Sequence, residues 1–117
     1  MSTDSSCTFC GIVERKIKTK IIAENNLVMV IHDFNPSAPF HFLIIPKLHL
    51  QDMNALAPPH ATIMSDMFMM AQELAKKMRV DTTGYRLVIN NGDQAGQTVF
   101  HLHIHFLAGR EFSWPPG

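Results

Sequence analysis

The sequence predicts an α+β fold, an antiparallel sheet of about five strands with one long helix and one short helix packed on a face of it. Five short runs rich in β-branched and aromatic residues, separated by turn-forming residues, predict the strands. One longer run has apolar residues at steps of three and four, as an amphipathic helix requires. With 117 residues, the chain has the length of one domain.

Ten basic and ten acidic residues leave the chain with no net charge. Proteins that bind nucleic acid or anionic membranes carry clustered Lys and Arg, so this balance favours a small-molecule partner. The apolar runs are shorter than the ~18 residues that span a bilayer, and the first residues lack the features of a signal peptide. We therefore expect a soluble, cytoplasmic protein. The small, polar residues 1–6 are expected to be disordered, and residues 7–117 to form a single domain.

Cys7 and Cys10 begin a segment that is expected to form one or two helical turns. Their Cys-x-x-Cys spacing can supply two thiolates to zinc, whose closed sites need four ligands. His49 and His101 are the candidates for the other two ligands. Two plain buried thiols are an alternative interpretation. A redox pair is another, but no thioredoxin-like βαβ pattern surrounds the cysteines.

The first three predicted strands are Lys20 to Glu24, Leu27 to His32 and His41 to Pro46. A pair of asparagines joins the first two strands and suits a tight hairpin, because Asn tolerates positive φ. Two prolines in the following loop interrupt strand pairing there. Asp33 and Phe34 begin this loop, where a carboxylate and an aromatic ring can bind a ribose diol and cover a purine. Taken alone, Asp33 is more often a residue that starts a loop.

Pro58 to Val80 is predicted to be the one long helix. Prolines suit its first turn, and three basic residues at its end complement the helix dipole. The apolar positions with helical spacing are Ile63, Met67, Met70, Ala71, Leu74, Ala75 and Met78. Met64, Phe68 and Met69 widen the apolar surface beyond what one sheet face covers, which predicts a contact between subunits.

The last two predicted strands are Tyr85 to Asn90 and Val99 to Ala108. The loop between them contains glycines that favour turns, and a strand rather than a helix follows it, so the loop is no P-loop. It carries Gln97 and Thr98, whose amide and hydroxyl groups can hold phosphate oxygens next to the last strand.

Three histidines alternate with apolar residues near the end of the chain, at positions 101, 103 and 105. On an extended strand they share one face, while the apolar residues face the core. Same-face neighbours lie about 6.6 Å apart on a strand, so the three rings form a row and cannot all bind one metal ion. Such a row can provide a nucleophile, an orienting partner and a phosphate binder. The alternatives are a metal site or an expression tag, and a tag has contiguous histidines.

The pattern at residues 101–107, with its histidines spaced by apolar residues, resembles the signature of the histidine triad (HIT) family of nucleotide hydrolases and transferases. The ending 109–117, which closes with Trp-Pro-Pro-Gly, is similar to the tail of the Hint branch, the histidine triad nucleotide-binding proteins. The likeness extends from about Cys7 to the last residue. It implies a HIT-like fold and a homodimer.

The resemblance implies a purine nucleoside phosphoramidase. His103 would attack the α-phosphorus of an adenosine or guanosine 5′-phosphoramidate and expel an amine, leaving a nucleotidyl-imidazole that water hydrolyses. His105, Gln97 and Thr98 would stabilise the phosphate oxygens, and the carbonyl of His101 would fix the tautomer of His103.

The resemblance also implies the binding residues. Asp33 would bind the ribose hydroxyls, and Trp114, in a tail that reaches toward the neighbouring subunit's site, would shape the leaving-group side. The implied nucleotide contacts are Phe9, Ile12, Ile31, His32, Asp33, Phe34, Asn90, Gly96, Gln97, Thr98, His103, His105 and Trp114. The implied ligands of a structural zinc ion are Cys7, Cys10, His49 and His101.

Other functions remain open at this point. Relatives with the same row of histidines hydrolyse dinucleoside polyphosphates, although the Trp-Pro-Pro-Gly ending favours the phosphoramidase branch. A nucleotide-binding adaptor with low turnover is a second alternative. A purely zinc-stabilised structural domain is a third, but it would leave His103 and His105 without a purpose. Taken as isolated residues, His32, His41 and His60 show no comparable pattern and are expected to be ordinary surface or pocket histidines.

Overall fold

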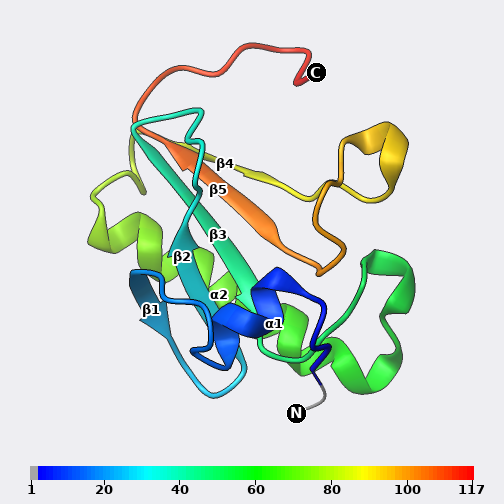
Figure 1. The fold of residues 1–117 in the computed structure, drawn as a ribbon. Helices are drawn as coiled ribbons and strands as arrows, with labels where there is room; N and C mark the ends of the chain where they lie inside the picture. Colours follow the sequence, from blue (N-terminus) through cyan, green and yellow to red (C-terminus); the bar gives the residue numbers. More distant parts are fainter. Residues whose placement is uncertain (1–2) are drawn as a thin grey trace.

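The structure is a computed structural model that describes residues 3–117. Within these residues, five antiparallel strands form one sheet in the order β1-β2-β3-β5-β4 (Figure 1). The strands are β1 (Ile21–Glu24), β2 (Val28–His32), β3 (Phe40–Pro46), β4 (Tyr85–Val88) and β5 (Ile104–Ala108). The helices are α1 (Thr8–Val13) and α2 (Ala61–Lys77), with 3-10 turns η1 (Met53–Ala55), η2 (Pro58–His60) and η3 (Asp93–Ala95). The predicted α+β fold is therefore confirmed.

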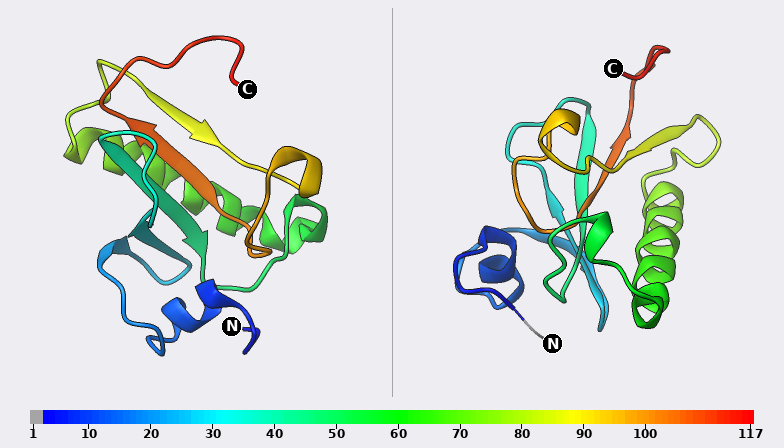
Figure 2. Two further views of the ribbon diagram at one scale, coloured as in Figure 1. Left: turned by 45° about the horizontal axis from the view of Figure 1, so that its top comes forward. Right: turned by 90° about the vertical axis from the view of Figure 1, so that its right-hand side faces the viewer.

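The two helices lie on opposite faces of the sheet, not on the same face (Figure 2, right). Strand β2 shows why: Val28 and Val30 belong to the apolar cluster under α2, whereas Met29 and Ile31 belong to the cluster under α1. The expectation of two helices on one face is thus wrong. Uninterrupted apolar runs in β2 and β3 indicate strands that are buried on both faces, and one helix on each face buries them.

The long helix α2 packs its predicted apolar stripe against the sheet. Its buried residues are Ile63, Met67, Met70, Ala71, Leu74 and Ala75. The helix begins at Ala61, three residues later than predicted, because Pro58 and Pro59 form a 3-10 turn instead. It ends at Lys77, and Arg79 takes a left-handed φ of 58° that stops the helix before Val80.

The last strand is shorter than predicted, since β5 begins at Ile104 and not at Val99. Ile44 pairs with Ile104, so the same register would set Pro46 opposite Leu102. Proline has no backbone N–H and cannot continue the ladder. Instead, the N–H of Leu102 donates to the carbonyl of Leu50 at 2.7 Å. The histidines at 101 and 103 therefore precede the strand, and only His105 lies in it.

The segment before α1 was predicted to be disordered over residues 1–6. Residues 1 and 2 lie outside the described residues. The N–H of Asp4 lies 3.3 Å from the Sγ atom of Cys10, and the carbonyl of Asp4 accepts from the N–H of Cys7 at 3.1 Å. Within residues 3–117, none of the helices is both long enough and apolar enough to cross a membrane.

Candidate active site and metal cluster

Helix α1 and the loop that contains η3 lie on the sheet face opposite α2 (Figure 2, right). The site lies between them, because its cavity is lined by Phe9 of α1 and by Gly96 and Thr98 of the loop. Strand β5 alternates here as predicted, because Ile104 and Phe106 are buried in the core under α2 while His105 points to the other face. A cavity of about 260 Å³ opens in front of the histidines. The residues that line it are Phe9, Asp33, Phe34, Asn35, Leu43, Asn90, Gly96, Thr98, Val99, His103 and His105.

The ring of His103 is fixed so that one nitrogen points away from the backbone. Its Nδ1–H donates to the carbonyl oxygen of His101 at 2.7 Å, so the neutral ring keeps its lone pair on Nε2. The edge of Phe9 and the ring of His105 pack around it, with centroids at 5.2 and 5.0 Å. Burial lowers the pKa of His103 below its usual 6.5, which keeps the imidazole neutral and nucleophilic near pH 7.

His105 is oriented by His41, a residue that the sequence did not single out. The backbone N–H of Ser37 donates to Nδ1 of His41 at 2.9 Å, so neutral His41 carries its proton on Nε2. That Nε2–H lies 2.9 Å from Nδ1 of His105 and donates to it. His105 therefore carries its own proton on Nε2. Burial, with smaller effects from His103 and His41, lowers the pKa of His105 to about 4, so the ring is a neutral donor.

The Nε2–H tautomer of His41 excludes a metal ion between Asp33, His41 and His105. Asp33, His41 and His105 bring three possible ligand atoms within 4.8 Å of one another. However, the atom of His41 that faces the other two is Nε2, and the Ser37 N–H forces the proton onto this atom. A histidine ligand needs a lone pair toward the metal and a proton on its other nitrogen, the reverse of what His41 shows. We therefore assign a hydrogen-bonded relay here.

A second cluster brings together all four predicted metal ligands, Cys7, Cys10, His49 and His101. The Nδ1 atom of His101 lies 3.3 Å from the Sγ of Cys7, 3.5 Å from the Sγ of Cys10 and 3.2 Å from the Nδ1 of His49. These separations match the edges of a tetrahedron with ligand bonds of about 2.0 to 2.3 Å. The predicted ligands thus form a closed, four-atom site.

The donor chemistry of this cluster fits a divalent cation. The Nε2–H of His101 donates to the carbonyl of Pro46 at 2.7 Å, which leaves the Nδ1 lone pair for a metal, as metal-bound histidines require. Burial lowers the pKa of His101 to about 4 and raises that of the Cys10 thiol to about 11. A thiolate at the depth of Cys10 needs a cation beside it, and a metal ion would supply the charge. The four residues therefore fit a structural metal ion.

Several predicted nucleotide contacts do not line the cavity. Ile12 and Ile31 are buried in the cluster beneath α1, and His32 is exposed on β2. Gln97 turns inward, where its Nε2 donates to the carbonyls of Gln51 and Val99, and its Oε1 accepts from the N–H of Gly92. It holds the η3 loop in place. Trp114 is 82% exposed on the C-terminal tail, away from the cavity.

Sequence reasoning missed four residues of the site. Asn35, Leu43 and Val99 line the cavity, and His41 orients His105. From the sequence alone, His41 and Leu43 are two residues apart in one predicted strand and should therefore share a face of the sheet. Leu43 pairs directly with His105 between β3 and β5, and His41 stands two residues before it, on the same face of the sheet. Only the register, which the sequence did not supply, brings these residues to the site.

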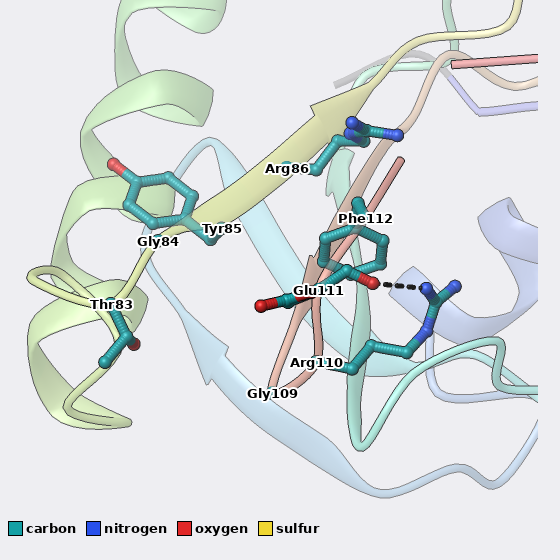
Figure 3. A pocket seen from close by; sticks show the side chains of 8 residues that line it. All are labelled: Thr83, Gly84, Tyr85, Arg86, Gly109, Arg110, Glu111 and Phe112. Carbon is teal, nitrogen blue, oxygen red and sulfur yellow. Dashed lines mark hydrogen bonds between the residues drawn. The ribbon is translucent and has the colours of Figure 1, made fainter. Parts of the chain in front are cut away.

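A larger cavity of about 610 Å³ lies elsewhere, at the start of β4 and after the end of β5 (Figure 3). Arg86, Arg110 and Phe112 are among the residues that line it, with Tyr85 at its edge. Its lining residues, all within the described part of the chain, include no histidine or cysteine. We place the chemistry at the smaller cavity because that cavity combines an oriented nucleophile with an oriented donor.

Related proteins identify the family to which this chain belongs. Residues 14–112 match the family model described as the HIT domain. The chain belongs to the HIT family. It is 44% identical over 109 residues to an uncharacterized HIT-like protein of Synechocystis sp., which covers 93% of this chain and 95% of the relative. It is 37% identical over 116 residues to the 14 kDa zinc-binding protein of Zea mays, which covers 97% of this chain and 90% of the relative.

Solved structures of the HIT family have the same fold. The HIT family hydrolase of Legionella pneumophila superposes with a TM-score of 0.93 at 36% identity, over 95% of this chain and 99% of that one. The histidine triad nucleotide-binding protein of Candida albicans superposes with a TM-score of 0.80 at 29% identity, over 93% of this chain and 82% of that one. The predicted family is therefore confirmed, and its members include hydrolases.

The buried histidines predict a loss of stability in acid. Burial lowers the pKa values of His41 and His105 below 6.5, and Asp33, which faces both rings, opposes this only in part. As the pH falls from about 6.5 toward about 4, the unfolded chain takes up protons before the folded chain does, so the free energy of unfolding should decrease. Urea unfolding between about pH 8 and pH 4 measures this decrease.

In the variant His105→Gln the decrease with pH should be shallower, because one buried titrating ring is gone. In His32→Gln, which removes an exposed histidine, it should match that of the wild type. Equal pH dependence in all three proteins would contradict this interpretation.

Proposed function

We propose that this protein hydrolyses the P–N bond of purine nucleoside 5′-phosphoramidates through a nucleotidyl-histidine intermediate. The observation that carries the proposal is the state of His103, a buried, neutral ring whose Nδ1–H is held by a carbonyl and whose Nε2 lone pair is available at the cavity. That is the arrangement of an activated nucleophile. The membership of hydrolases and nucleotide-binding proteins in the family supports the reaction class and the ligand.

The cavity wall suits a nucleoside monophosphate. Phe9 and Phe34 offer apolar rings to a base, and Phe34, which is 69% exposed at the rim, gains cover if a base stacks on it. The carboxylate of Asp33 can accept from two ribose hydroxyls. The hydroxyl of Thr98 can donate to phosphate, and Gly96, whose φ of 85° favours glycine, lets the ligand approach the loop closely.

In the proposed first step, Nε2 of His103 forms a bond to the α-phosphorus, and the P–N bond breaks. The departing amine takes a proton from water at the open mouth of the cavity. The ring of His103 becomes positively charged, and the carbonyl of His101, which already accepts its Nδ1–H, stabilises that charge. The Nε2–H of His105 donates to a phosphate oxygen. In the second step, water breaks the P–Nε2 bond, which releases the nucleoside monophosphate and restores His103.

We also propose that Cys7, Cys10, His49 and His101 bind a structural zinc ion. The related zinc-binding protein of Zea mays supports this assignment. Four protein ligands leave no position for substrate, so the metal would stabilise the fold and take no part in catalysis. It would hold α1, and with it Phe9, against the segment that carries His103.

We propose, finally, that two copies assemble as a homodimer. Strand β4 is at one edge of the sheet, and α2 exposes Phe68 and Met69, with 47% and 51% of their surfaces accessible. Large apolar side chains in adjacent exposed positions are typical of a protein interface.

The variant His103→Ala tests the reaction. Its turnover of an adenosine 5′-phosphoramidate should fall by at least about 1,000-fold, because the nucleophile is lost. Wild-type protein in a single-turnover experiment should gain the mass of one nucleotide, and the variant should not. The matched control His60→Ala, outside the cavity, should keep wild-type turnover. Retention of most activity in His103→Ala would contradict the mechanism, and faster turnover of diadenosine polyphosphates would favour the other hydrolase activity.

Metal analysis tests the zinc ion. Protein purified without chelator should contain about one zinc ion per chain. In Cys10→Ser the metal content should fall, and the protein should unfold at a lower temperature because α1 loses its anchor. The control Ser6→Ala, next to the cluster, should retain the metal. Wild-type protein without stoichiometric zinc would contradict the assignment.

The mass in solution tests the dimer. Light scattering at micromolar concentration should give twice the mass of one chain. Phe68→Glu should give a monomer, because it places a charge in the proposed interface. The control Asn26→Glu adds the same charge in the exposed turn between β1 and β2, at the opposite edge of the sheet, and should remain dimeric. A monomeric wild-type protein would overturn the proposal.

A further inference from the structure

The backbone of Ser37 forms hydrogen bonds through both its N–H and its carbonyl group. This residue lies in the loop between β2 and β3, the loop that begins with Asp33. Its N–H donates to Nδ1 of His41 at 2.9 Å, and its carbonyl accepts from Nε–H of Arg110 at 3.0 Å. Arg110 comes from the C-terminal tail, 73 residues further along the chain. The backbone of one residue, Ser37, thus joins the tail to the histidine relay through the two peptide groups that meet at its Cα atom.

The guanidinium of Arg110 is itself fixed by neighbouring groups of the tail. It stacks on the ring of Phe112, with Cζ 4.3 Å from the ring centroid, and its Nη1 donates to the carbonyl of Glu111 at 2.8 Å (Figure 3). A stacked guanidinium has fewer rotamers to lose, so its hydrogen bond to Ser37 costs less entropy. Arg110 can therefore act as a rigid support for the loop.

A second contact between the tail and the loop lies beside the first. Gly109 leaves β5 with a φ of 97°, and a Cβ atom at this position would stand 2.8 Å from Cβ of Pro39. The tail thus packs directly on the loop near Ser37. This close approach keeps the distance between Arg110 and the Ser37 carbonyl short.

We infer that Arg110 is a positioning residue for the histidine row, acting through Ser37 and His41 on His105. If the backbone at Ser37 shifts when its carbonyl is released, its N–H can turn away from His41. Nδ1 of His41 then loses its donor, and the ring can take the other tautomer with its proton on Nδ1. Its Nε2 would then accept from His105 instead of donating to it. His105 would lose the proton on Nε2 that it needs to donate to phosphate. Arg110 therefore fixes which nitrogen of His105 is the donor.

This role rests on the proposed function, in which His105 donates to a phosphate oxygen. Arg86 offers a matched control on the same aromatic ring. Its Cζ lies 5.2 Å from the ring centroid of Phe112, and its Nη2 donates to the carbonyl of Ser113 rather than to Ser37. Arg86→Gln and Arg110→Gln therefore remove the same charge and the same kind of stacking, but only Arg110→Gln releases the carbonyl of Ser37.

The experiment compares wild type, Arg110→Gln, Arg110→Lys and Arg86→Gln, each with its mass in solution measured. Long-range ¹⁵N NMR of the imidazoles should show the Nε2–H tautomer of His105 in the wild type and in Arg86→Gln, and a mixture of tautomers in Arg110→Gln. With adenosine 5′-phosphoramidate, Arg110→Gln should lower kcat about fivefold with little change in KM. Arg86→Gln should stay within about twofold, and Arg110→Lys, which can still donate to Ser37, should recover most of the loss.

The proposal is overturned if Arg110→Gln leaves the tautomer of His105 unchanged, or if Arg86→Gln disturbs it equally. Because the NMR measurement needs no substrate, it decides the role of Arg110 even if the wild type does not cleave phosphoramidates. Failure of the wild type to cleave phosphoramidates would refute the proposed function and leave the role of Arg110 unaffected.

Discussion

The site depends on one constraint, that each of its histidines has one ring nitrogen engaged by a fixed partner. His101 donates to the carbonyl of Pro46, His103 donates to the carbonyl of His101, and His41 accepts from the N–H of Ser37. His105 then accepts from His41. A neutral imidazole has one proton, so each engagement decides what the other nitrogen does. The result is one ring with a lone pair toward the cysteines, one with a lone pair toward the cavity, and one that can donate, all made from one type of side chain.

These partners lie in the loop before β3, at the end of β3 and in the segment before β5, so the sheet positions them. Apolar residues under α2 form the core, and the opposite face carries α1 at one end and the histidines at the other. The end of the β3–β5 ladder at Pro46 is also part of the site. Since Pro46 cannot continue the ladder, its neighbourhood is free to receive the ring of His101, and its carbonyl accepts from that ring.

Local patterns in the sequence predicted much of this arrangement. The strands, the long helix and its stripe followed from periodicity, and the alternation at 101–105 identified the face of the histidines. What could not be predicted depended on distant parts of the chain. The side of the sheet that α1 takes, and the contact between His41 and His105, require the pairing of β2, β3 and β5. Periodicity within one segment contains no information about its register with another.

His101 links the group of four metal ligands to the ring of His103 at the cavity. Its imidazole belongs to the group of four metal ligands, and its carbonyl, on the same residue, accepts the proton of His103. If the ring of His101 moved and shifted the backbone at this residue, the carbonyl of His101 would move too. This carbonyl sets the tautomer of His103, the proposed nucleophile. Because the ring is completely buried and bonded to Pro46, such movement requires local unfolding of the segment before β5. A closed metal site at this residue would therefore preorganise His103, the proposed nucleophile, from outside the cavity, without contact between metal and substrate.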